Sequence, residues 1–117
     1  MSKLRAKRVS DLLKEETARI IQYNIKDPRV GFTTVTGAEV SSDLRYAKVF
    51  YTVFGDDAVR EGTREGLESA KPYIRRELAK ILSTKVVPHL TFVYDVSIER
   101  GQRLEDLINR TSSNEDD

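Results

Sequence analysis

Cysteine is absent from the 117 residues, which include one histidine, one methionine and three prolines. The lack of cysteine excludes disulfide bonds, thiolate zinc sites and a cysteine nucleophile. The first residues are charged rather than apolar, and no segment approaches the roughly 20 consecutive apolar residues of a membrane-spanning helix. We therefore expect a cytoplasmic protein without a membrane partner.

Motifs for catalysis or cofactor binding are also missing. His89 is the only histidine, so a histidine-based catalytic or metal site has no second imidazole to complete it. The adjacent acids Asp56 and Asp57 precede a predicted helix, and we interpret them as its N-cap and dipole partners rather than as metal ligands. Neither a G-x-G-x-x-G loop nor a Walker sequence occurs. These absences predict a protein that is not an enzyme and holds no metal or cofactor.

Charged residues are abundant, at 33% of the chain against roughly 25% in typical globular proteins. The net charge of +1 is unevenly distributed, because residues 111–117 contain three acids and no base. The remaining 110 residues contain 20 bases and 16 acids. We expect one domain over residues 1–110 and an acidic, disordered tail over 111–117, which has nothing apolar to bury.

The first half of the sequence predicts a helix followed by two strands. From about Leu4 to Asn24, apolar residues recur at three- and four-residue spacing, which is typical of an amphipathic helix. Residues 33–40 and 46–54 are rich in β-branched and aromatic residues, and the second segment alternates cleanly. The turn residues 41–43 leave only a short connection, which favours an antiparallel pair.

The second half predicts two more helices and a last strand. One helix runs from the acids at 56–57 to about Ser69, and the next begins near Lys71 and Pro72. A strand follows from Pro88 to Ile98, and a short helix after Gly101 ends the domain. The order α-β-β-α-α-β predicts an α+β fold with helices covering a three-stranded sheet. The buried stripe of the helix after Pro72 is expected to contain Ile74, Leu78, Ile81 and Leu82.

Two basic clusters are candidates for binding nucleic-acid phosphates. The first occupies the opening of the first helix, and a solvated helix start is an equally good interpretation of it. The second has five bases in fifteen residues, opposed only by Glu77, and there we favour RNA contact over a solvated helix. The candidate RNA-binding residues are Arg5, Lys7, Arg8, Lys71, Arg75, Arg76, Lys80 and Lys85.

The predicted element order resembles the type II KH module, in which a G-x-x-G loop between two helices clamps the nucleic-acid backbone. No G-x-x-G occurs in this sequence, and the junction instead contains Ala70 and Pro72. The junction is accompanied, in order, by the opening Arg5-Ala-Lys-Arg8, Asp27-Pro-Arg-Val30 and the segment 87–95. Across nearly all of residues 1–110, this set resembles the ribosome-binding factor A family of bacterial small-subunit maturation factors.

The resemblance implies an interhelical kink at Ala70 in place of the glycine loop. The family usually has Ala-x-Gly there, whereas this sequence has Pro72 at the glycine position. Proline fixes φ and removes one N–H, so it subtracts a possible phosphate donor. The resemblance further implies a non-catalytic factor, expected to be a monomer, that binds the free immature 30S subunit and its 16S rRNA. Such a factor assists late rRNA maturation and then dissociates, and many members are associated with adaptation to cold.

Two other classes of function are compatible with the sequence. A protein-interaction module would use the charges only for solubility, and its exposed strand edges or helices would bind another factor. A small hydrolase or nuclease is disfavoured by the single histidine and the missing set of metal ligands.

Overall fold

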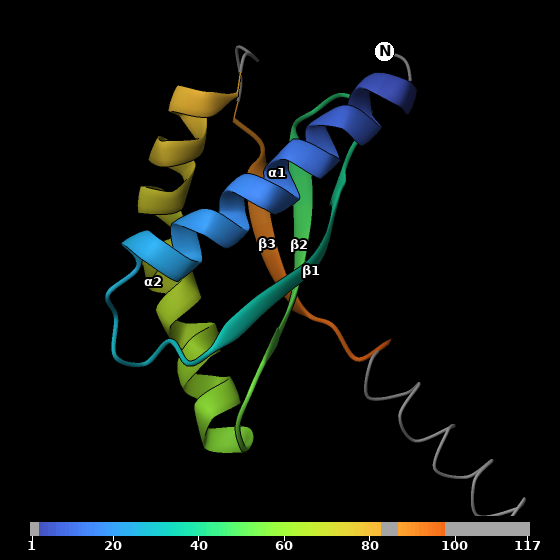
Figure 1. Cartoon of the computed structure of the whole chain (residues 1–117). Helices are drawn as coiled ribbons and strands as arrows, with labels where there is room; N and C mark the ends of the chain where they lie inside the picture. The colour runs from blue at the N-terminus through green and yellow to red at the C-terminus, as the bar shows by residue number, and fades with distance from the viewer. Residues whose placement is uncertain (1–2, 83–86, 98–117) are drawn as a thin grey trace, which may run out of the picture.

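The computed structural model describes residues 3–82 and 87–97, which form two helices and one three-stranded sheet (Figure 1). The predicted α+β fold class is confirmed. Core side chains of both helices pack against the sheet face that carries Ala47, Val49 and Tyr51. In chain order the elements are α1 (Lys3–Asn24), β1 (Thr33–Val40), β2 (Tyr46–Val53), α2 (Asp57–Ile81) and β3 (His89–Tyr94).

The strand order in the sheet is β1-β2-β3. As predicted, β1 and β2 are antiparallel, with Val35 opposite Tyr51 and a bulge between Val35 and Gly37. β3 runs parallel to β2, with Phe92 opposite Val49, because α2 carries the chain from the end of β2 to the other end of the sheet. The first residues of β2 and β3 therefore lie side by side.

Helix α1 follows the predicted amphipathic pattern. Leu13, Thr17, Ile20 and Ile21 are buried, and Leu13 and Thr17 have no exposed surface. The charged residues Lys14, Glu15 and Arg19, which lie between the apolar positions, are all exposed. The three- and four-residue periodicity thus orients the helix correctly on the sheet.

The predicted break between two central helices is wrong, because α2 continues through Pro72. A proline inside a helix costs about 3 kcal/mol, since it has no N–H for the carbonyl four residues earlier. Leu67, Ile74 and Leu78 on the same helix are fully buried, and each such side chain contributes about 1.5–3 kcal/mol. Core packing on both sides of Pro72 therefore outweighs the lost hydrogen bond. A kink at Ala70 and Pro72 stays a prediction.

The ends of several elements differ from their predicted positions. Ile81 is 40% exposed rather than buried, because α2 ends there and the extended Leu82 occupies the core position instead. β2 ends at Val53, which leaves Phe54 exposed. β3 ends at Tyr94, where Asp95 begins a turn by accepting hydrogen bonds from the backbone N–H and the hydroxyl of Ser97. The predicted strand is therefore wrong over residues 95–97. Its predicted end at Ile98, the C-terminal helix, Lys85 and the tail lie outside the described residues.

Candidate nucleic-acid interface

The N-terminal candidate cations lie on the first two turns of α1. The side chains of Arg5, Lys7 and Arg8 are all exposed. Lys7 approaches Asp11 with 3.9 Å between Nζ and Oδ2, and both side chains are mostly in solvent. Exposed pairs of this kind contribute at most about 1 kcal/mol. Lys7 is therefore available to exchange the carboxylate for a phosphate.

Charge is segregated along α2. Residues 57–70 contain four acids and two bases, whereas residues 71–81 contain four bases and one acid. Arg76 and Lys80 are exposed near the C-terminal end of the helix, where unpaired backbone carbonyls favour cations. The Arg76 guanidinium lies 5.9 Å from the centre of the Tyr73 ring, and Lys80 Nζ lies 3.2 Å from Glu77 Oε1. The second half of α2 is thus a cationic surface with an aromatic ring beside it.

The other two candidates on α2 have partners within the fold. Lys71 Nζ lies 2.8 Å from Glu68 Oε2 and 6.0 Å from the centre of the Phe92 ring. Arg75 donates hydrogen bonds to the carbonyls of Val87, at 3.0 Å, and Pro88, at 3.3 Å. Arg75 therefore holds the segment that leads into β3 against α2. Sequence reasoning grouped it with the surface cations because its spacing does not reveal those carbonyls.

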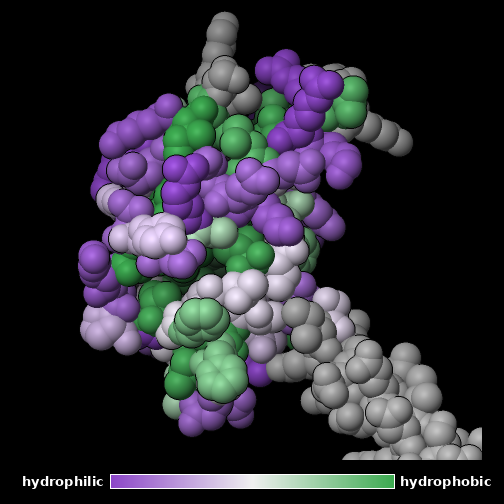
Figure 2. Space-filling model, in the orientation of Figure 1, coloured by the Kyte–Doolittle hydropathy of each residue, from purple (hydrophilic) through white to green (hydrophobic). Residues whose placement is uncertain are grey.

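The exposed cations from the two helices gather at one end of the molecule. Figure 1 shows the first turns of α1 and the last turns of α2 at its upper end, together with the first residues of β2 and β3. Figure 2 shows hydrophilic side chains at this upper end, with hydrophobic ones between them. We call this region the basic end, and define it by Arg5, Lys7, Arg8, Arg76 and Lys80.

Three residues at the start of β2 and β3 were missed by sequence reasoning. Arg45 and His89 are exposed and adjacent, since the His89 N–H donates to the Arg45 carbonyl at 2.8 Å. The rings of His89 and Tyr46 are 5.8 Å apart, and Tyr46 is 62% exposed. Aromatic rings beside cations can stack on unpaired RNA bases. The parallel pairing of β2 with β3 creates this group, so the sequence alone contained no signal for it.

The segment Asp27–Val30, in the loop after α1, packs against α2. The Arg29 guanidinium contacts both carboxylate oxygens of Asp27 and donates to Ser69 Oγ on α2 at 3.1 Å. The hydrogen bonds between the two side chains lower the pKa of Asp27 and raise the pKa of Arg29. Gly66 lies directly beneath Val30, where a Cβ would meet a Val30 methyl at 2.5 Å. Gly62 and Gly66 therefore permit close packing of α2 against this loop.

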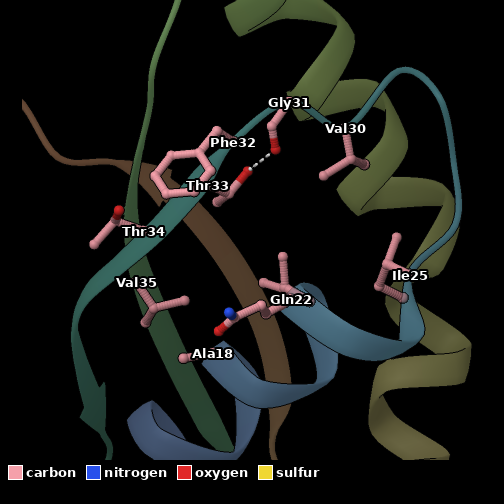
Figure 3. A pocket seen from close by; sticks show the side chains of 10 residues that line it. Ala18, Gln22, Ile25, Val30, Gly31, Phe32, Thr33, Thr34 and Val35 are labelled. Atoms are coloured by element: carbon pink, nitrogen blue, oxygen red, sulfur yellow. Dashed lines mark hydrogen bonds between the residues drawn. The ribbon is translucent and has the colours of Figure 1, made fainter.

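A hollow of about 370 Å³ lies between α1 and the start of β1 (Figure 3). Its lining includes the apolar residues Ile21, Val30 and Val35 and no titratable side chain. Within residues 3–82 and 87–97, no three metal-binding side chains cluster and neither helix is long and apolar enough to cross a membrane. The basic end, with its exposed cations, is therefore a better candidate for a binding site than this hollow.

Known proteins are similar to this chain over most of its length. The family model for ribosome-binding factor A matches residues 5–108. Ribosome-binding factor A of Nitrosomonas europaea is 49% identical, over 90% of each chain. The crystal structure of the Thermus thermophilus factor is 26% identical, with a TM-score of 0.68 over 76% of this chain and 93% of that one. A homology model of the Thermus thermophilus factor, fitted into a cryo-EM map of its 30S complex, has 26% identity and a TM-score of 0.63, covering 74% of this chain and 91% of that one. The chain belongs to the ribosome-binding factor A family.

Proposed function

We propose that this protein binds the immature 30S subunit through contacts of its basic end with 16S rRNA, assists late rRNA maturation and then dissociates. The observation that carries the proposal is the gathering of exposed cations from α1 and α2 at one end of the fold. The related Thermus thermophilus factor, which has been fitted into a map of a 30S complex, supports the choice of particle.

Phosphate contacts supply the affinity in this mechanism. Lys7 is paired with the exposed Asp11, and Lys80 with the partly buried Glu77. Because both ammonium groups lie mostly in solvent, these pairs are weak enough to be replaced by phosphates. Each neutralised phosphate releases counterions, so affinity falls as salt rises. Tyr46 and His89 add surfaces on which unpaired bases can stack. Residues 1–110 form the RNA-binding domain of the proposal, and the protein acts as a monomer without turning over a substrate.

A double charge reversal, Arg76→Glu with Lys80→Glu, tests this mechanism. Binding to protein-free 16S rRNA and to immature 30S subunits is measured over a salt series. If each side chain contacts one phosphate, the magnitude of the slope of log K against log salt falls by roughly 1.4–1.8, and affinity drops by at least about tenfold at 0.15 M salt.

The control reverses two exposed charges outside the basic end, Lys14→Glu with Lys26→Glu, and so matches the change in net charge. We expect the control to retain most of the affinity and salt slope. Equal behaviour of the two double variants would show that the basic end is not the docking surface.

The maturation step is tested in cells that carry the Arg76/Lys80 variant in place of the wild-type protein. We expect precursor 16S rRNA to accumulate, more strongly at low growth temperature, with free 30S subunits in excess. Normal processing in a strain whose variant no longer binds 30S subunits would refute a role in maturation.

A further inference from the structure

The end of the molecule opposite the basic end exposes a group of apolar side chains. Phe54 is 85% exposed and Phe32 is 78% exposed, the highest values among the large apolar residues described. The two residues are adjacent, because the Phe54 N–H donates to the Phe32 carbonyl at 2.9 Å. Val59, at the start of α2, is 36% exposed beside them. Figure 2 shows the hydrophobic group at the lower end, and we call Phe32, Phe54 and Val59 the apolar tip.

The backbone beneath the apolar tip is held in place. The buried Thr63 hydroxyl accepts from the Gly31 N–H at 3.0 Å and donates to the Val59 carbonyl at 2.8 Å. A Cβ at Gly31 would lie 2.8 Å from a Val59 methyl, and one at Gly55 would lie 2.7 Å from Val59 Cβ. Only glycine allows these approaches. Because the surface is already ordered, a partner that binds it avoids much of the entropy cost of ordering.

The hollow between α1 and β1 adjoins the apolar tip and extends it. Phe32 stands at its edge in Figure 3, where the chain enters β1. The volume of about 370 Å³ lies within the range of ordinary binding pockets. A side chain that entered this hollow would meet the apolar residues Ile21, Val30 and Val35, with Gln22 and Thr33 as hydrogen-bonding groups.

The charge beside the apolar tip disfavours RNA. A helix N-terminus normally attracts phosphate, but here the Asp56 carboxylate occupies that position and accepts from the Val59 N–H at 3.0 Å. Asp57 adds a second negative charge in the first turn. The acidic first half of α2 continues from this point. The complementary partner is therefore a polypeptide with an apolar or aromatic side chain flanked by lysine or arginine.

We infer that the apolar tip and the adjoining hollow bind such an apolar-basic segment of a protein component of the small subunit, while the basic end contacts its RNA. The inference rests on the proposed function, since it assumes that the protein docks on the 30S particle. It adds a second, protein-directed contact at the opposite end of the domain.

The double variant Phe32→Ser with Phe54→Ser separates the two contacts. Its affinity is measured for immature 30S subunits and for protein-free 16S rRNA. We expect about tenfold weaker binding to the particle, the size of a modest interface hot spot, and no change on the free RNA. The matched control is Tyr23→Ser, an aromatic residue on α1 that is 65% exposed and outside the apolar tip. Because all three side chains are exposed, both variants should keep the wild-type melting temperature.

A photo-reactive phenylalanine analogue at position 54 identifies what touches the tip. A cross-link to a 30S protein is expected after irradiation of the complex. A cross-link to 16S rRNA, or an equal loss of free-RNA binding in the serine variant, would overturn the inference. Self-association of the free wild-type protein that the serine variant abolishes would instead assign the surface to a second copy. If the wild type binds 30S subunits and the serine variant binds them equally well, this inference is refuted but the proposed function is not. If the wild type does not bind 30S subunits, the proposed function is refuted as well.

Discussion

The fit between α2 and the loop after α1 predicts that Gly66→Ala destabilises the fold. A Cβ at this position would lie 2.5 Å from Val30 Cγ2 and 3.6 Å from Arg29 Cβ. Alanine favours a helix over glycine by about 1 kcal/mol, whereas overpacking a tight contact costs about 1–3 kcal/mol. The loop cannot retreat freely, because Arg29 is bound to Asp27 and Ser69. We therefore expect a net loss of about 1 kcal/mol in the free energy of unfolding.

Denaturant unfolding of a double-mutant cycle with Val30→Ala checks this reasoning. Removing the Val30 methyls opens the space that the new Cβ needs, so in that background Gly66→Ala should be neutral or stabilise by up to about 1 kcal/mol. The two substitutions should then couple by about 1–2 kcal/mol. If Gly66→Ala stabilises the wild-type protein, or has the same effect in both backgrounds, the contact with Val30 does not explain why glycine stands there.

Two further predictions concern the side chains that fix the loops. Arg75→Ala should lower the free energy of unfolding, measured in urea, by about 1.5–3 kcal/mol, which is the typical contribution of hydrogen bonds to a charged group. Under conditions in which the variant is folded, its affinity for 30S subunits should fall less than that of the Arg76/Lys80 variant. Because Arg29 depresses the pKa of Asp27 below 3.8, its usual value, the pair stabilises the fold above about pH 4, and this contribution disappears as pH falls through the lowered pKa. Asp27→Asn should therefore reduce the slope of unfolding free energy against pH in the acid range, and an unchanged slope would count against the pair.

Periodic segments of the sequence predicted the structure well, whereas Pro72 led to a helix boundary that the structure does not have. Residues 46–54 alternate, and the strand that they form buries Ala47 and Val49, because a half-buried strand has one face toward the core. Pro72 suggested a helix boundary, since its local cost is large. The structure overrides it because Leu67 and Ile74, on either side, are both fully buried. Burial of that kind depends on the sheet beneath the helix, which no local pattern reports.

The sequence predicted which segments of the candidate site are rich in basic residues, but not how the fold places them. Clustering in the sequence identified Arg76 and Lys80, which are exposed at the basic end. The same clustering included Arg75, whose partners are carbonyls of a segment distant in sequence. Phe54 was expected within a strand, and its exposure follows from β2 ending one residue earlier. The neighbourhood of Phe32 and Phe54 arises from strand pairing, which the sequence specifies only through the whole fold.

The two ends of the domain can act independently because α2 separates them. The helix has 25 residues, and at 1.5 Å per residue it spans about 37 Å. This length is several times the Debye length of about 8 Å at physiological salt. The acids beside the apolar tip therefore do not cancel the field of the basic end, and the net charge of +1 understates both. An RNA surface should attract the domain by one end and repel it at the other, so that electrostatics orients the protein before contact. In that orientation the apolar tip is directed away from the phosphates that the basic end contacts, which leaves it open to a partner of different chemistry.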